Sequence, residues 1–165
     1  NGSEESRCIV KQLLSPLPAA RRGTMIGQYL KACNKAIDEL LEESVGQTKG
    51  KTLVLGTEEY MFPALLLAQK LKEASTAESV KYHATTRSPI GISQEKGYPI
   101  TNGVKLHSIY DRDRYTYLYD LESYDTAIIF TDAKKVIPEA VKDLTRSLEE
   151  KQCRNVLFFY GSNHV

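Results

Sequence analysis

Hydrophobic positions along the first half of the chain change their spacing once. Over residues 24–41 apolar side chains recur every three or four positions, with glutamates outside the stripe, which predicts an amphipathic helix of about five turns. Residues 52–55 are instead a short apolar run that stops at Gly56, as buried parallel strands do. A second helix is predicted over 61–74, with Pro63 in its first turn. Strand, glycine turn and helix together indicate the opening of a βαβ unit.

The second half of the chain continues this alternation. Strands are predicted over 80–85, 126–131 and 155–160, with a helix from Pro138 between the last two. Residues 104–110 and 115–121 are β-prone and indicate a hairpin, and 89–103 is a Gly- and Pro-rich surface excursion of the kind that often forms lids. We therefore expect an α/β fold: a mainly parallel, Rossmann-like (phosphoribosyltransferase-like) sheet flanked by helices, with a β-rich insertion and an extra N-terminal helix.

The start of the chain has no clear period. Residues 4–22 contain Pro16 and Pro18 and close on a basic pair before Gly23. We interpret residues 1–23 as an arm or linker that wraps the domain, and residues 24–165 as a single α/β domain.

Composition limits the partners. The 165 residues suit one domain, and 22 basic against 21 acidic residues leave no overall field that favours nucleic acid or a membrane. Three separated cysteines without a CxxC motif, and no leader or bilayer-spanning run, favour a cytoplasmic protein with reduced thiols. The three histidines lie far apart in the sequence and have no acidic or thiol residues near them at the spacing of metal ligands. We therefore expect no metal and no cofactor.

The strongest candidate chemistry lies at the end of the strand over 80–85. There Thr85, Thr86, Arg87 and Ser88 enter one turn before Pro89 and offer several hydrogen-bond donors to a phosphate or carboxylate. The alternative is ordinary turn chemistry, with Arg87 serving a structural carboxylate.

The preceding strand ends in Gly56, Thr57, Glu58 and Glu59. This is neither a GxGxxG fingerprint nor a P-loop, and the two acids disfavour phosphate at the following helix. They are interpreted mainly as helix caps, or else as groups that orient sugar hydroxyls or transfer protons. With a right-handed crossover these acids and Arg87 border one crevice at the carboxyl edge of the sheet. Asp132, after the strand over 126–131, is a further candidate acid, with a plain solvated turn as its alternative.

The hairpin region is rich in tyrosine, at positions 110, 115, 117, 119 and 124. Beside Arg112 and Arg114 these rings are able to stack a nucleobase. We favour ordinary strand filling instead, with each hydroxyl at the water line.

The residues from Leu53 to Met61, then Thr85-Thr86-Arg87-Ser88-Pro89-Ile90, Gly97-Tyr98-Pro99-Ile100 and Tyr119-Asp120 together resemble the TRSP domain of bacteria, over about residues 50–161. This resemblance implies a domain carboxyl-terminal to a phosphoribosyltransferase-like domain, in gene clusters associated with tellurite resistance and stress response. It further implies a role in making or handling a nucleoside-like metabolite.

The chain also departs from a working phosphoribosyltransferase. Residues 131–135 carry one acid and no glycines where those enzymes place two acids and a glycine-rich phosphate loop, so transfer by this chain alone is not expected. We expect a ligand-binding or accessory catalytic domain that takes an anionic small molecule, a phosphosugar or nucleotide. The alternative is a non-catalytic module that docks on an upstream phosphoribosyltransferase-like domain or forms a homodimer through the stripe of Ile26, Leu30, Ile37 and Leu41.

Overall fold

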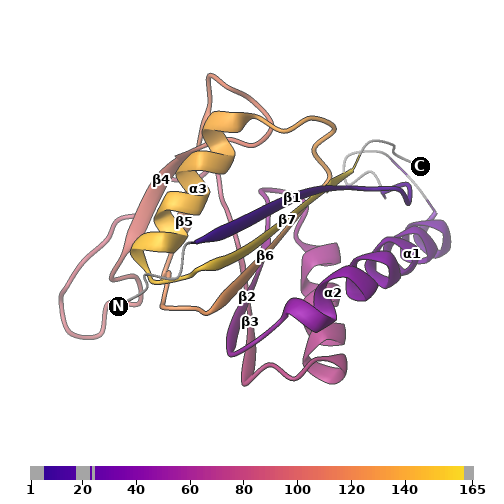
Figure 1. Ribbon diagram of the computed structural model, residues 1–165. Helices are drawn as coiled ribbons and strands as arrows, with labels where there is room; N and C mark the ends of the chain where they lie inside the picture. Colours follow the sequence, from indigo (N-terminus) through magenta and orange to yellow (C-terminus); the bar gives the residue numbers. More distant parts are fainter. Residues whose placement is uncertain (1–5, 18–22, 24, 162–165) are drawn as a thin grey trace.

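A parallel sheet runs through the middle of the molecule. The structure, a computed structural model, describes residues 6–17, 23 and 25–161. In these residues five strands pair in the order β1-β7-β6-β2-β3, all parallel, as Figure 1 shows. The strands of this sheet are β1 (Arg7–Leu13), β2 (Lys51–Gly56), β3 (Ser79–Ala84), β6 (Thr126–Thr131) and β7 (Asn155–Gly161). The prediction of a mainly parallel α/β sheet is confirmed.

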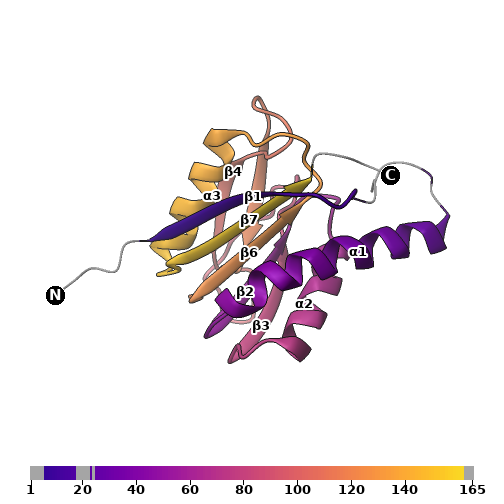
Figure 2. The ribbon, with the colours of Figure 1, turned by 45° about the vertical axis from the view of Figure 1, so that its right-hand side comes forward.

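Two layers cover the sheet. The helices α1 (Ile26–Ser44) and α2 (Phe62–Ala74) lie on one face, and the helix α3 (Pro138–Glu150) lies on the other (Figure 2). Beside α3 is a separate antiparallel hairpin of β4 (Gly103–His107) and β5 (Tyr115–Tyr119). The predicted N-terminal helix and β-rich insertion are therefore confirmed, and Pro63 lies in the first turn of α2 as expected.

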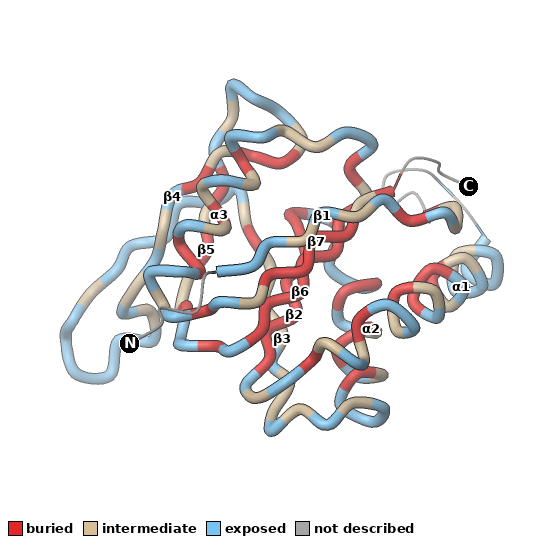
Figure 3. The backbone as a smooth tube through the Cα atoms, in the orientation of Figure 1, coloured by how far each residue is buried: buried red, intermediate tan, exposed pale blue. Residues whose placement is uncertain are grey.

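The core has two halves, because successive strand residues point to opposite faces. In β2, Val54 packs beneath α1 and α2, whereas Leu53 and Leu55 pack towards α3 and the hairpin. The inner strands are buried almost throughout, and Figure 3 shows this as a continuous red band. Such strands read in the sequence as unbroken apolar runs, which is why they were easily predicted.

Residues 7–13 differ from the expectation of an arm or linker. They form β1, an edge strand that pairs with β7 from Arg7↔Asn155 to Leu13↔Gly161. Most of its side chains are exposed or half-buried, so the apolar pattern of a buried strand is absent. Its end is tied to α1, because the backbone N–H groups of Leu14 and Ser15 both donate to the Glu39 carboxylate at 2.7 Å. Two parts of the predicted arm, residues 1–5 and 18–22, lie outside the described residues.

A candidate ligand site at the carboxyl ends of β2 and β3

A cavity of about 350 Å³ opens where β2 and β3 end. The two strands pair in parallel from Lys51↔Ser79 to Gly56↔Ala84, so the turns that follow them lie at the same edge of the sheet. The cavity is lined by residues of these two turns and the start of α2: Glu58, Glu59, Met61, Ala84, Thr85, Thr86, Arg87 and Ser88. The predicted crevice with Arg87 and both glutamates at its border is therefore present.

Arg87 joins the two turns. Its Nε donates to Glu58 Oε2 at 2.9 Å, and its Nη2 donates to Glu59 Oε1 at 2.7 Å. The hydrogen bond to Glu58, together with the charges of both acids, raises the pKa of Arg87 above its ordinary value, so the guanidinium stays charged. Its Nη1 makes no hydrogen bond to any residue that the structure describes. One donor edge of the guanidinium thus remains at the cavity.

Glu58 is the buried acid of the pair. Its side chain is only 2% exposed. It accepts a hydrogen bond from Ser108 Oγ at 2.6 Å and forms an ion pair with Arg114, whose Nη2 lies 2.8 Å from Glu58 Oε2. Its backbone has φ +50°, a left-handed conformation that costs energy for a non-glycine residue, and its N–H donates to Thr85 Oγ1 at 3.0 Å. Contacts from several elements therefore hold this strained turn in one arrangement.

The interpretation of Glu58 and Glu59 as caps of the next helix is wrong. The residue that caps α2 is Met61, no side chain makes a cap hydrogen bond, and the first turn of α2 contains no acid. The short turn of residues 57–60 separates both glutamates from the helix and directs them to Arg87 instead.

The turn after β3 is anchored to the hairpin. Thr86 exchanges two backbone hydrogen bonds with Tyr117, at 2.8 and 2.7 Å, and so forms a one-residue antiparallel bridge to the edge of β5 that faces away from β4. Thr86 Oγ1 accepts from the Ser88 N–H at 3.2 Å, and Tyr119 Oη donates to the Ser88 carbonyl at 3.2 Å. The four predicted donors of residues 85–88 are therefore held beside the cavity by β5.

The other predicted site residues lie behind or beside the cavity rather than on its wall. The Gly56 carbonyl accepts the Thr85 N–H at 3.0 Å, and buried Thr57 shares its hydroxyl with Tyr110 at 2.6 Å and Thr131 at 2.8 Å. Tyr110 Oη also donates to Asp132 Oδ1 at 2.5 Å, and burial together with the negative Asp132 raises the pKa of this phenol. Asp132 is thus linked to the β2 turn through Tyr110 and Thr57.

Ser108 and Arg114 were not predicted. Both come from the connection between β4 and β5, and both bind Glu58. The sequence places Arg114 in a run of alternating charges beside tyrosines and gives no sign of its ion pair, because its partner lies 56 positions earlier in the chain. No local pattern signals such a contact.

The tyrosines of the hairpin region fall into two groups. Tyr124 is 4% exposed and fills the core, but its hydroxyl is buried with it rather than lying at the water line as predicted. Tyr115, Tyr117 and Tyr119 lie on the face of β5 that alternates with buried Thr116 and Leu118, and Tyr115 is 44% exposed. These three side chains are exposed or half-buried, which agrees with the prediction of strand residues that reach the solvent.

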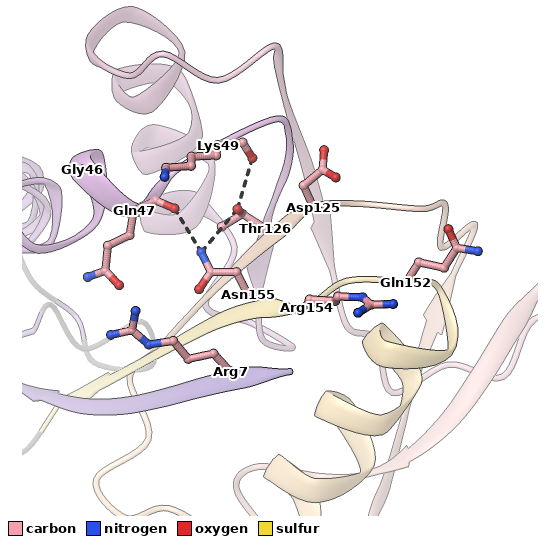
Figure 4. Close-up of a pocket in the computed structure, with 9 residues that line it drawn as sticks. All are labelled: Arg7, Gly46, Gln47, Lys49, Asp125, Thr126, Gln152, Arg154 and Asn155. Atoms are coloured by element: carbon pink, nitrogen blue, oxygen red, sulfur yellow. Dashed lines mark hydrogen bonds between the residues drawn. The ribbon is translucent and has the colours of Figure 1, made fainter. Parts of the chain in front are cut away.

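A larger cleft of about 980 Å³ lies at the opposite, amino edge of the sheet (Figure 4). Its polar side chains brace the beginnings of strands: Asn155 Nδ2 donates to the Gln47 carbonyl at 3.0 Å, and Thr126 Oγ1 donates to the Lys49 carbonyl at 3.1 Å. The hydrogen bonds drawn in Figure 4 connect the first residues of β6 and β7 to the segment that follows α1. Parallel sheets place ligands at the other edge.

Two general features complete the description. Among the described residues, no group of three or more His, Cys, Asp or Glu side chains is placed to hold a metal ion. No helix in that part of the chain has the length and apolar character needed to cross a membrane.

Comparison with known proteins assigns the chain to one family. Neither the curated proteins nor the solved structures yielded a match. A family model described as "TRSP domain C terminus to PRTase_2" matches residues 19–148, from before α1 to near the end of α3. This is most of the chain and includes both turns that line the cavity, and the chain therefore belongs to the TRSP domain family, whose members lie C-terminal to a PRTase_2 domain.

Proposed function

We propose that this chain is a ligand-binding or accessory catalytic domain of a phosphoribosyltransferase-type protein, and that its cavity at the ends of β2 and β3 binds a phosphosugar or nucleotide. The observation that carries the proposal is the position of Arg87, which is fixed by two carboxylates while its Nη1 keeps no protein partner among the described residues. A guanidinium held in this way is prepared to receive a phosphate oxygen.

The balance of charge favours a ligand with both an anionic and a hydroxyl-bearing part. Glu59 is half-exposed and bonded to Arg87, so it also repels a bare anion that enters the cavity. A sugar hydroxyl donates to such a carboxylate, whereas inorganic phosphate gains nothing from it. The hydroxyls of Thr86 and Ser88 supply further donors on the same wall.

The residues then divide by role. Arg87, Thr86 and Ser88 bind the phosphate, and Glu59 orients sugar hydroxyls. Buried Glu58 positions Arg87 and Arg114, because its oxygens are taken by those guanidinium groups and by Ser108. Thr85 supports the Glu58 backbone, with Gly56 and Thr57 behind it. Asp132 is the weaker candidate for proton transfer, acting beside Tyr110.

Calorimetry with ribose 5-phosphate, ribose and inorganic phosphate tests this function. Wild type is expected to bind ribose 5-phosphate more tightly than either fragment. Arg87→Ala is expected to weaken that binding by about 10- to 100-fold, the usual effect of losing a charged hydrogen-bond partner. Arg112→Ala is the matched control, because Arg112 is 69% exposed and lies outside the cavity wall.

Equal affinity of wild type and Arg87→Ala for ribose 5-phosphate would contradict the proposal. Because Arg87→Ala leaves two acids without their cation, the far-UV spectrum and unfolding of each unliganded variant are measured first. Arg87→Lys preserves the charge but not the planar guanidinium group with its several donors. Its affinity for ribose 5-phosphate is expected to lie between those of wild type and Arg87→Ala.

Membership of the TRSP family supports a proposal for the wider role. We propose that the ligand belongs to the synthesis of a nucleoside-like metabolite linked to bacterial stress and tellurite resistance, in the cytoplasm. In a full-length protein that carries both domains, deletion of this domain is expected to lower tellurite tolerance, and Arg87→Ala is expected to lower it to the same extent. Unchanged tolerance of the variant would disconnect the cavity from that role.

A second function has one specific observation in its favour. Large apolar side chains gather at the first turns of α1 and α2, where the rings of Tyr29 and Phe62 lie 6.2 Å apart. We define this apolar patch by its exposed members: Met25 (74%), Ile26 (78%), Leu30 (38%), Met61 (49%), Phe62 (44%) and Leu65 (49%). Ile37, by contrast, is fully buried, so only the beginning of the predicted stripe is exposed.

The occupant we propose for this patch is the PRTase_2 domain, because members of the family lie C-terminal to that domain and Met61 belongs to both the patch and the cavity wall. Binding of a separately produced PRTase_2 domain to this chain is expected to fall at least tenfold with Leu65→Lys. It is expected to be unchanged with Leu14→Lys, an equally apolar residue that is 86% exposed outside the patch. Self-association that Leu65→Lys abolishes would assign the patch to a homodimer instead.

A further inference from the structure

The outward face of the β4–β5 hairpin carries a row of aromatic rings. Tyr115, Tyr117 and Tyr119 alternate along β5 with buried residues, so all three rings lie on one side of the hairpin. The rings of Tyr117 and Tyr119 are nearly parallel, with an angle of 7° between their planes and 6.2 Å between their centroids. Two parallel rings two residues apart on a strand offer aromatic faces of the same orientation for stacking.

This aromatic row adjoins the cavity. Thr86, which lines the cavity, is directly paired with Tyr117 across an antiparallel bridge. Side chains of such a pair lie on the same face, with Cβ atoms about 4.5–5.5 Å apart. The Tyr117 side chain therefore lies beside that of Thr86, at the border of the cavity.

The two ends of the row are fixed by other contacts. Tyr119 Oη accepts the Ile90 N–H at 2.5 Å and donates to the Ser88 carbonyl, and Gly103 leaves room for its ring, since a Cβ there would lie 2.5 Å from it. At the other end the Lys105 ammonium lies 3.9 Å from the centre of the Tyr115 ring. Tyr117 is the ring between them, and its hydroxyl makes no hydrogen bond among the described residues.

We propose that Tyr117, supported by the parallel Tyr119 ring, stacks the base of a nucleotide whose phosphate lies at Arg87. The inference rests on the proposed function and narrows its ligand from a phosphosugar or nucleotide to a nucleotide. A single nucleotide is favoured over a nucleic-acid strand, because 22 basic and 21 acidic residues leave a net charge of only +1 to attract a polyanion.

Adenosine 5′-monophosphate and ribose 5-phosphate form the matched pair of probes, since they differ by the base. Wild type is expected to bind the nucleotide about 10- to 100-fold more tightly, the ordinary contribution of one base stacked on an aromatic side chain. Uridine 5′-monophosphate is expected to lie between the two probes, because stacking depends on ring area and tolerates any base.

Two variants of Tyr117 separate the ring from its hydroxyl. Tyr117→Ile, which keeps a good strand former, is expected to remove the preference for the nucleotide while leaving ribose 5-phosphate binding unchanged. Tyr117→Phe retains the ring and is expected to behave as wild type. Tyr98→Leu is the control for loss of an exposed tyrosine elsewhere, because Tyr98 is 38% exposed on the excursion before β4.

Each outcome identifies what fails. Equal affinity of wild type for both probes would overturn the stacking inference while leaving the phosphate site intact. Loss of the nucleotide preference in Tyr98→Leu but not in Tyr117→Ile would also overturn it. Failure of both probes to bind would remove the proposed function itself. A single-stranded oligonucleotide that binds more tightly per site than the mononucleotide would replace the nucleotide with a strand.

Discussion

The two edges of the central sheet carry different kinds of hollow. The amino edge has the larger one, about 980 Å³, and the carboxyl edge has one of about 350 Å³. At the amino edge, side chains such as Asn155 and Thr126 bond to nearby backbone carbonyls and brace the starts of strands. At the carboxyl edge, Glu58 gathers two guanidinium groups and a hydroxyl from separate elements around a left-handed backbone.

The difference teaches that cavity size alone does not identify a functional edge. Strained backbone and a buried acid are costly, and they persist only where surrounding contacts determine them. The amino-edge cleft also contains a left-handed residue, Gln152 with φ +67°, but among the described residues only the carboxyl edge combines such backbone with a buried acid in one turn. The carboxyl edge therefore has the features expected of a preorganised ligand site, whereas the polar contacts at the amino edge serve to hold the strands in place.

Substitution of one acid at each edge is expected to produce the largest difference in the free energy of unfolding. Glu58→Gln leaves Arg87 and Arg114 without their shared carboxylate, and is expected to lower the free energy of unfolding by about 2–4 kcal/mol, reduced from the fully buried case because both arginines are partly exposed. Asp125→Asn, at the amino edge, loses charge at an exposed residue whose carboxylate accepts the Lys51 N–H, and is expected to cost about 1 kcal/mol. Urea unfolding measures both.

Equal losses for Glu58→Gln and Asp125→Asn would break the comparison, since the two edges would then be equally dependent on their acids. The slope of unfolding against urea is checked in each case, so that a change in stability is distinguished from a change in the denatured state.

Matched glycines test how closely the backbone is packed at each edge. A Cβ on Gly56 would lie 2.9 Å from the Tyr60 carbonyl oxygen and 3.2 Å from Ala64 Cβ, so Gly56→Ala must shift backbone and is expected to cost about 1–3 kcal/mol. Gly46, beside the amino-edge cleft, has open space around its Cβ position. Gly46→Ala is expected to be neutral or to stabilise by up to about 1 kcal/mol.

Thermal and urea unfolding of the two alanine variants supply the measurement. A Gly56→Ala protein as stable as wild type would mean that the turn after β2 yields easily, which a preorganised edge does not.

The smallest effect concerns the contact that holds the hairpin beside the carboxyl edge. Asp143 on α3 accepts from His107 Nδ1 at 2.6 Å and from the His107 N–H at 3.2 Å. Burial acts to raise the pKa of Asp143, but these hydrogen bonds and the charges of His107 and Arg146 together lower it below the ordinary value of 3.8. A carboxyl with a lowered pKa stabilises the fold above its unfolded pKa, and this stability is lost as the pH falls through the folded pKa.

As the pH falls from 5 to 3, the free energy of unfolding measured in urea is therefore expected to decrease less for Asp143→Asn than for wild type. The difference is expected to stay below about 1 kcal/mol, because the pair is partly exposed. Identical pH profiles would indicate that the contact contributes nothing to hairpin docking.

The sequence predicts those parts of the molecule in which local pattern and position agree. Buried strands such as β2 and β6 appear as apolar runs, and neighbouring parallel strands must deliver their turns to one edge, so the meeting of Arg87 with Glu58 and Glu59 follows from topology. The amphipathic stripe of α1 and the first-turn proline of α2 are equally local signals.

What escaped prediction depends on distant packing. The edge strand β1 lacks the signature of burial because its outer side has no neighbour in the sheet. Arg114 finds Glu58 only because the hairpin folds over the β2 turn, and the outward row of β5 tyrosines depends on which face of that hairpin meets the core. Alternation along a strand indicates that its two faces have different surroundings. When both faces carry large residues, the pattern does not indicate which face packs against the core.

The pairing of β1 with β7 has a consequence for how the protein is made. The two strands join residues near position 10 to residues near position 158, so one of the closest partnerships in the sheet spans almost the whole chain. During synthesis the first strand has to wait, unpaired, until the last one leaves the ribosome. A pairing between residues so distant in sequence raises the contact order, which slows folding.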